Sequence, residues 1–284
     1  MKIPQIKTAP LCASFCALSA FFLVGVTTLT ANVTTEFNSP SDVSSRFDTI
    51  DSGAAGSIDY STDAGIGGVA GRVNLADIGD ASGKGLYTVG TVDPNEGGFT
   101  SSFFFLAEEY TTTTPSRIAL GLSPDQTNLR ANSEVQVRLI KNGATNGTFE
   151  VRDSKNDSGG DNINTTNVTL VDNHWYLFSV DFSNFASGSM NLDASITDYG
   201  TVGTVAGSVI ATAKAGRAVP PDDFLDSGTR VPLYIGILAQ NDGGGALALD
   251  NINMPNTAVI PESNNFALLA SLSSLAFILI RRRS

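Results

Sequence analysis

The sequence is poor in the residues on which many enzymes and many small extracellular domains depend. Its 284 residues include two Cys, one His and one Trp. Cys12 and Cys16 both precede residue 32, so the rest of the chain cannot be stabilised by disulfide bonds. With His174 alone, at most one Ser-His-Asp triad is available, and no Gly-x-Ser-x-Gly motif is present. We therefore expect His174 to be a structural or surface residue.

Basic residues are also scarce, and five of the 17 Lys and Arg lie near the chain ends, namely Lys2, Lys7 and Arg281 to Arg283. Between Asn32 and Ile260 there remain 12 basic against 27 acidic residues, a formal net charge of −15. Such a surface repels nucleic acid and anionic membranes. It is compatible with neutral polysaccharide or with divalent cations.

The first 31 residues have the layout of a secretory signal. Lys2 and Lys7 precede an uncharged apolar stretch from Leu11 to Leu29, which is the order of regions in a signal peptide. We predict a signal peptide over residues 1–31, cleaved near Ala31, with an uncleaved anchor helix as the alternative. Neither cysteine lies in a lipoprotein cleavage box, so a lipid anchor is not expected.

Residues 32–258 have the short runs and Gly, Asn, Asp and Ser clusters of a single all-β domain. The stretch 133–154 alternates apolar and polar residues around the turn KNGATNG, which predicts a β-hairpin. Residues 174–184, HWYLFSVDFSN, are apolar on both faces, which places this strand inside a packed sandwich. Further strands are expected at 57–61, 70–76, 85–92, 98–110 and 190–200. The runs 231–242 and 246–254 are expected to pair across the turn NDGGG.

Two of these runs carry a resemblance to a known fold family. HWYLFSVDFSN followed by MNLDASITDYG resembles the strand pair of concanavalin A-like, laminin-G-type jelly rolls, and LALDNINM resembles the closing strand of such sandwiches. The resemblance covers much of residues 85–254. It implies a concanavalin A-like jelly-roll β-sandwich, flanked here by an N-terminal signal helix and a C-terminal hydrophobic helix.

The C-terminal residues 259–284, VIPESNNFALLASLSSLAFILIRRRS, resemble the PEP-CTERM sorting signal of bacterial exported proteins. Pro261 and Glu262 fall on its motif, Phe266 to Ile280 on its hydrophobic helix, and Arg281, Arg282 and Arg283 on its basic end. Ile260 and Ser263 depart from the commonest motif residues. The resemblance implies processing by an exosortase-type membrane transpeptidase and delivery to the surface or matrix of a Gram-negative bacterium.

The physical properties of this tail agree with a transient membrane anchor. As a helix, the stretch from Phe266 to Ile280 would span ~22 Å, against a bilayer core of ~30 Å. Flanking residues and snorkelling arginines extend this to a marginal span. The three arginines would hold the terminus on the cytoplasmic side of the inner membrane, with the preceding domain outside.

The jelly-roll resemblance also suggests a test for sugar hydrolysis, because glucanases of this fold carry paired carboxylates as Glu-x-Asp-x-x-Glu or Glu-x-Asp-x-Glu. No glutamate of the chain begins either spacing. Glu108 and Glu109 are adjacent, so on a strand they would point to opposite faces and could not flank one bond. We therefore predict that the protein is not an enzyme. A divergent glycoside hydrolase or lyase that uses other carboxylates is the alternative.

Calcium is the cofactor that the acidic loops suggest. RDSKNDSGGDN places Asp153, Asp157 and Asp161 in one Gly-containing loop with hard oxygen ligands. Asp250 is a second candidate, since related sandwiches hold a structural calcium ion near the closing strand. The alternatives are a solvated turn for the loop, and for Asp250 a carboxylate that accepts backbone N–H groups at a strand end.

Sugar binding would require exposed aromatic faces beside amides and carboxylates. Trp175 is expected in the core, whereas Tyr87, Tyr110 and Tyr199 lie near strand ends and could reach the surface. The sequence as a whole predicts an exported cell-surface or matrix protein that binds polysaccharide. A purely structural surface protein is a further alternative.

Overall fold

The computed structural model describes one part of the chain in detail. The described residues are 32–51, 56–77, 84–92, 98–107, 117–126, 135–141, 146–153, 162–183, 190–217, 225–226, 229–230, 233–240 and 246–255. All of them belong to the second of two compact units, Met1–Thr30 and Ala31–Ser284. Among them, no helix has both the length and the apolar character needed to cross a membrane. The predicted signal peptide and sorting tail lie outside the described residues.

Strands make up almost all of the described structure. The elements are β1 (Asn32–Thr35), α2 (Pro40–Arg46), β2 (Phe47–Asp51), β3 (Gly56–Ala64), the 3₁₀ helix η2 (Ile66–Gly68), β4 (Ala70–Asp77), β5 (Lys84–Thr88), β6 (Phe99–Leu106), β7 (Arg117–Ser123), β8 (Val135–Lys141), β9 (Asn146–Asp153), β10 (Asn162–Thr169), β11 (Trp175–Ser183), β12 (Met190–Asp198), β13 (Val209–Arg217), β14 (Leu225–Asp226), β15 (Thr229–Arg230), β16 (Tyr234–Gln240) and β17 (Ala246–Pro255).

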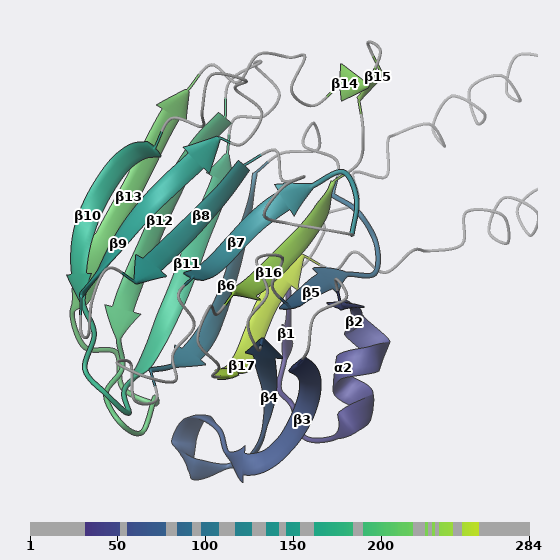
Figure 1. Cartoon of the computed structure of the whole chain (residues 1–284), viewed down its shortest axis with the longest axis vertical. Helices are drawn as coiled ribbons and strands as arrows, with labels where there is room; N and C mark the ends of the chain where they lie inside the picture. The colour runs from purple at the N-terminus through teal and green to yellow at the C-terminus, as the bar shows by residue number, and fades with distance from the viewer. Residues whose placement is uncertain are drawn as a thin grey trace, which may run out of the picture. The chain divides into compact units, whose positions relative to one another are not determined.

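Most of these strands form two layered antiparallel sheets, and β14 and β15 pair separately as a two-stranded sheet (Figure 1). Sheet A has the order β13-β12-β11-β6-β17-β4-β3, with β1 added to β17. Sheet B has the order β10-β9-β8-β7-β16-β5-β2. The all-β sandwich that the sequence predicts is confirmed.

The core lies between the sheets and follows from the alternation of side chains along each strand. On β8, Val137 and Leu139 are buried in the main core, and on β6 Phe103 and Phe105 occupy the same layer. Phe103 stacks on Phe178 of β11 with ring centroids 4.9 Å apart. As predicted, β11 is an interior strand, flanked by β12 and β6.

Of the two hairpins predicted from local sequence, one is confirmed and the other is wrong. The hairpin around KNGATNG is confirmed, because β8 pairs with β9 in register from Val135↔Asp153 to Lys141↔Gly147. The predicted pairing of β16 with β17 is wrong. β16 pairs with β5 and β7 in sheet B, whereas β17 pairs with β1, β4 and β6 in sheet A. The connection between β16 and β17 therefore crosses from one sheet to the other. Long-range packing determines this, and the composition of the turn does not.

One side of the sandwich opens between the edge strands β2 of sheet B and β3 of sheet A, and the short helix α2 lies beside both (Figure 1). The helix begins with Pro40 in its first turn, where proline costs no hydrogen bond. Asp42 accepts hydrogen bonds from the backbone N–H groups of Asn38 and Ser39 at 2.9 and 2.8 Å, and so caps the helix. Val43 and Phe47 attach α2 to the main core.

Candidate functional site

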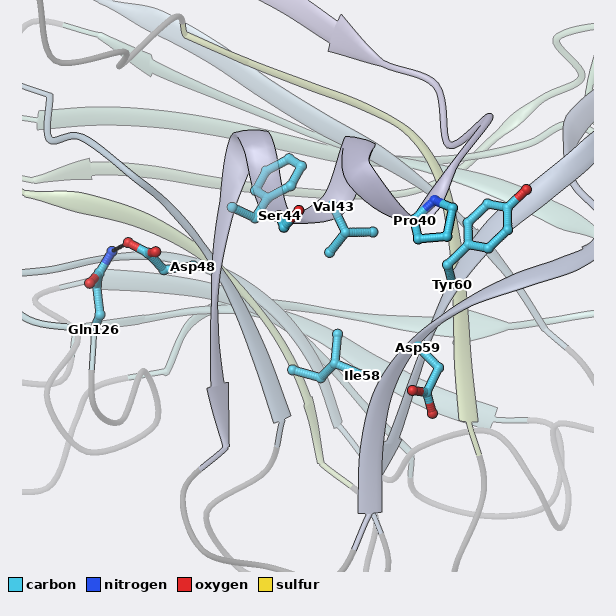
Figure 2. A pocket seen from close by; sticks show the side chains of 9 residues that line it. Pro40, Val43, Ser44, Asp48, Ile58, Asp59, Tyr60 and Gln126 are labelled. Atoms are coloured by element: carbon cyan, nitrogen blue, oxygen red, sulfur yellow. Dashed lines mark hydrogen bonds between the residues drawn. The ribbon is translucent and has the colours of Figure 1, made fainter.

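A pocket of about 730 Å³ lies where α2 meets β2 and β3, and we call it the mouth pocket (Figure 2). Its lining is Pro40, Val43, Ser44, Phe47, Asp48, Ile58, Asp59, Tyr60 and Gln126. Val43 of α2 and Ile58 of β3 face one another across it, with Pro40 next to Tyr60 on one side. The volume lies within the range of small-ligand sites, ~300–1,000 Å³. None of these residues was predicted from the sequence as a site residue.

Polar groups stand on opposite sides of the mouth pocket. On one side Gln126 donates through Nε2 to Asp48 Oδ2 at 2.7 Å and to the Thr88 carbonyl at 2.9 Å, which holds the amide in place. On the other side, the Tyr60 hydroxyl donates to the Asn38 carbonyl at 3.3 Å, and Asp59 follows Ile58 on β3 (Figure 2). Apolar and aromatic side chains with a few polar groups beside them are typical of small-molecule pockets.

The outer face of sheet B forms a second candidate site. Side chains that alternate with the core residues are polar and yet buried, namely Gln136, Arg138, Glu150 and Gln240 at 0, 5, 3 and 4% exposure. Arg138 and Glu150 are opposite one another on β8 and β9 and form an ion pair. Burying such groups is costly unless they are paired and hydrogen-bonded. The ion pair between Arg138 and Glu150 therefore offsets part of the cost of burying the two charges.

Next to that ion pair the same face is apolar. Tyr87, Ala119 and Leu238 form a small buried cluster with Tyr234 packed against it. Gly121 of β7 is opposite Gly236 of β16, and a Cβ on Gly121 would meet the Val135 carbonyl oxygen at 2.7 Å. Gly121 is opposite Gln136, and Gly236 is opposite Tyr87. Because neither glycine has a side chain, no side chain rises from the sheet between Gln136 and Tyr87. Tyr87 itself is 1% exposed, so the expectation that it could reach the surface is wrong.

Asp250, predicted as a calcium ligand or a backbone acceptor, serves as a backbone acceptor. Its Oδ2 accepts the Ile66 N–H at 2.8 Å and its Oδ1 accepts the Asn251 N–H at 2.7 Å. Burial raises the pKa of this carboxyl, and the hydrogen bonds oppose that change. Asp250 lies at a register shift within β17 rather than at a strand end, and Asn251 there adopts φ of +46°. A hollow of about 120 Å³ adjoins it, lined among others by Glu36 and Gly71.

No three His, Cys, Asp or Glu side chains gather into a metal-binding group within the described residues. Asp153 ends β9, while Asp157 and Asp161 lie outside the described residues. The calcium site in the loop of Asp153, Asp157 and Asp161 stays a prediction. Thermal melting with chelator and with calcium in excess would test it, since an ion bound to the folded state raises Tm.

His174 pairs with one carboxylate. Its Nδ1 lies 3.0 Å from both oxygens of Asp198, and Asp198 Oδ1 also accepts the Gly200 N–H at 2.7 Å. Within the described part of the chain, no Ser or Thr hydroxyl is hydrogen-bonded to His174. The His174–Asp198 pair connects the residue before β11 to the last residue of β12. The structure thus places His174 where a structural histidine was predicted.

The other aromatic candidates lie on sheet A or outside the described residues. Trp175 is 3% exposed and packs with Leu106 and Ala248 in a small cluster distinct from the main core. Tyr199 is half-buried and meets Phe104 edge-on at 4.8 Å. Tyr110 lies outside the described residues, as do Pro261, Glu262 and Arg281 to Arg283 of the tail.

Comparison with known proteins shows the fold. No protein-family model matches the chain, and no curated protein matches it in sequence. Among solved structures, the calreticulin globular domain of T. cruzi is similar with a TM-score of 0.50 at 10% identity, over 85% of this chain and 98% of that one. An endo-β-1,4-glucuronan lyase of the fungus Trichoderma reesei has a TM-score of 0.49 at 9% identity, over 80% and 95%. A Bauhinia forficata lectin in complex with GalNAc has a TM-score of 0.48 at 12% identity, over 78% and 96%.

The similarity to the calreticulin globular domain agrees with a jelly-roll β-sandwich built from the two antiparallel sheets. At such identities the likeness is one of fold alone. One fold can serve binding proteins as well as enzymes. What the protein does has to be argued from its own side chains.

Proposed function

We propose that the protein is an exported, non-enzymatic polysaccharide-binding protein of the bacterial cell surface or matrix, and that the mouth pocket is its sugar-binding site. The observation that supports this most directly is the composition of that pocket. Tyr60 and Ile58 offer an apolar surface to a sugar ring, while Asp48 and the amide oxygen of Gln126 offer acceptors for hydroxyl groups.

Export and sorting are supported by the sequence of the two chain ends. The signal-like residues 1–31 would direct translocation, and the tail with Pro261, Glu262 and the three terminal arginines would be the substrate of an exosortase-type enzyme at the inner membrane. A polysaccharide-binding domain delivered to the cell surface would contact the polymer that the cell secretes.

Filling the mouth pocket tests the binding proposal. Ser44 lines the pocket from the exposed surface of α2, so Ser44→Trp would occupy it with little effect on the core. We expect this variant to lose at least about tenfold in affinity for a polysaccharide that the wild-type protein binds. The matched control is Ser45→Trp, because Ser45 is equally exposed on the same helix and does not line the pocket.

Affinity gel electrophoresis against a panel of neutral, basic and acidic polysaccharides would provide the readout. Equal binding by Ser44→Trp and the wild type would place the site elsewhere. Absence of binding to any polymer in the panel would contradict the proposed function and favour a purely structural surface protein.

A carbohydrate-active enzyme is the second candidate, and the outer face of sheet B is the observation that favours it. Arg138 and Gln136 there carry N–H groups that could donate to a sugar carboxylate, and Glu150, the ion-pair partner of Arg138, is a buried carboxylate beside them. Release of reducing ends or of unsaturated products from polysaccharides, abolished by Glu150→Gln, would establish this function. A lack of turnover on a panel that the protein binds would reject it.

A further inference from the structure

The inward side of the mouth pocket is apolar. In the register of the two strands, Ile58 and Tyr60 of β3 lie opposite Leu75 and Val73 of β4, and these two β4 residues are core residues at 0% exposure. Ile58 and Tyr60 therefore point inward and pack against the main core, yet both stay partly exposed. The open edge of the sandwich thus leaves inward-facing apolar surface in contact with the pocket.

Two aliphatic side chains enclose one region of this pocket. Val43 of α2 and Ile58 of β3 face one another across it (Figure 2), and we call the space between them the aliphatic gap. A hydroxyl group placed there would lose its hydrogen bonds to water without a replacement, which is costly. A methyl group would lose no hydrogen bond and would bury apolar surface.

The polar side chains beside the gap present hydrogen-bond acceptors. The Gln126 amide uses its N–H groups within the protein, since Nε2 donates to Asp48 Oδ2 at 2.7 Å and to the Thr88 carbonyl at 2.9 Å. Its carbonyl oxygen and the Asp48 carboxylate are left to accept from a ligand. The Tyr60 hydroxyl donates its single hydrogen to the Asn38 carbonyl at 3.3 Å.

The remaining lining residues add no side-chain donor that is uncommitted. Ser44 donates to the Ser41 carbonyl at 3.4 Å, and the lining contains no Lys, Arg or His. The carboxylate of a uronic acid, or the carbonyl oxygen of an acetyl group, would therefore find no side-chain donor here. Hydroxyl groups, which donate, match the acceptors.

A 6-deoxyhexose combines the two groups that this pocket can accommodate, because its ring carries hydroxyl groups and its C6 is a methyl group. We propose that the mouth pocket recognises 6-deoxyhexose residues of a polysaccharide, with the C6 methyl group in the aliphatic gap and ring hydroxyls donating to Asp48 and to the Gln126 carbonyl oxygen. This inference rests on the proposed polysaccharide binding and narrows its ligand class.

Two pairs of free sugars that differ only at C6 test the inference. L-Fucose is L-galactose without the C6 hydroxyl, and L-rhamnose is L-mannose without it. We expect the 6-deoxy member of at least one pair to bind the full-length protein at least about tenfold more tightly. Saturation-transfer NMR titrations would measure the affinities, and the C6 methyl protons should receive the strongest saturation.

Variants that place a hydroxyl in the gap locate the methyl group. Val43→Thr and Ile58→Thr should each reduce the preference for the 6-deoxy sugar to about threefold or less and leave the affinity for its C6-hydroxyl partner nearly unchanged. The matched control is Val209→Thr, because Val209 of β13 is 57% exposed and does not line the pocket. Circular dichroism and thermal melting would verify that each variant is folded.

Three outcomes would overturn the inference while leaving polysaccharide binding in place. These are equal affinities within both sugar pairs, a preference that persists unchanged in both gap variants, and binding of polysaccharides by a protein that binds none of the four sugars. Failure of every sugar and every polysaccharide to bind would reject the proposed function itself, and the inference with it.

Discussion

Two buried polar side chains of this sandwich, Asp250 and Tyr176, are satisfied by backbone groups. Asp250 accepts the N–H groups of Ile66 and Asn251, and the Tyr176 hydroxyl accepts the Val171 N–H at 2.7 Å. A buried polar atom without a partner would cost about 1–3 kcal/mol. Both side chains therefore fix loops to the strands that carry them, the loop at Ile66 to β17 and the turn at Val171 to β11.

Tyr176 should make the free energy of unfolding fall at alkaline pH. Burial, reinforced by nearby Asp198 and Asp172 and opposed by the hydrogen bond from Val171, raises its pKa to about 12. In the unfolded chain the pKa is about 10. The folded state therefore holds this proton more tightly, and the resulting stability is complete below about pH 10 and lost as the pH rises toward 12.

We expect Tyr176→Phe to remove this alkaline loss. The variant should unfold about 1–2 kcal/mol more easily at neutral pH, because the Val171 N–H loses its acceptor, and its free energy of unfolding should fall less between pH 10 and 12. Urea titrations across that range would measure both effects. Tyr199→Phe, which changes a half-buried tyrosine, is the control. A wild-type alkaline slope in Tyr176→Phe would show that another group is responsible.

At the scale of elements, sequence alternation predicted the strands whose pattern is local. Val135, Val137 and Leu139 fixed the inward face of β8, and the two-faced run at Trp175 placed β11 in the sheet interior. The sheet to which each strand belongs could not be predicted from local alternation. The NDGGG stretch suggested a hairpin between the two closing strands. Instead, β16 pairs with both β7 and β5 in sheet B, which places the two closing strands in different sheets.

The mouth pocket could not have been predicted from local patterns either. Asp48 and Gln126 are hydrogen-bonded although 78 positions separate them, and Tyr60 comes from a third segment. No spacing rule connects such residues, because the fold alone brings them together. Tyr87 shows the opposite error: its place near a strand end suggested exposure, whereas packing beside Ala119 and Leu238 buries it.

The helix α2 forms one wall of the mouth pocket, so its cap should affect both stability and binding. Asp42→Ala would remove the acceptor for the N–H groups of Asn38 and Ser39. We expect a loss of about 1 kcal/mol in the free energy of unfolding and a weaker affinity for the ligand of the pocket, since Val43 and Ser44 would be held less firmly. Urea titration would measure the free energy of unfolding, and affinity gel electrophoresis would measure the affinity.

The control for α2 is Asp181→Asn, which removes an aspartate far from any helix cap. Its stability and affinity should match those of the wild type. If Asp42→Ala reduced stability but left the affinity unchanged, the helix would serve the fold and not the pocket.

At the scale of the whole molecule, the proposed export assigns separate purposes to the domain and to the two chain ends. The sandwich carries an acidic surface and the candidate binding sites, and it is stabilised without any cysteine. Five of the 17 basic residues lie near the chain ends, with Arg281, Arg282 and Arg283 in the last four positions. Such a division of charge suits a domain that functions outside the cell and a tail that contacts the inner face of a membrane.

Replacing Pro261 and Glu262 by Ala tests this division in a Gram-negative host that contains an exosortase-type transpeptidase. Intact mass spectrometry of the wild-type protein should show loss of residues 1–31 and of the tail, and the protein should leave the inner membrane. The double variant should lose only the N-terminal segment and stay in the membrane fraction, because its apolar stretch and arginines still anchor it. Ser263→Ala, a change beside the motif, should be processed like the wild type. Release of the double variant in the same form as the wild type would mean that Pro261 and Glu262 do not direct processing.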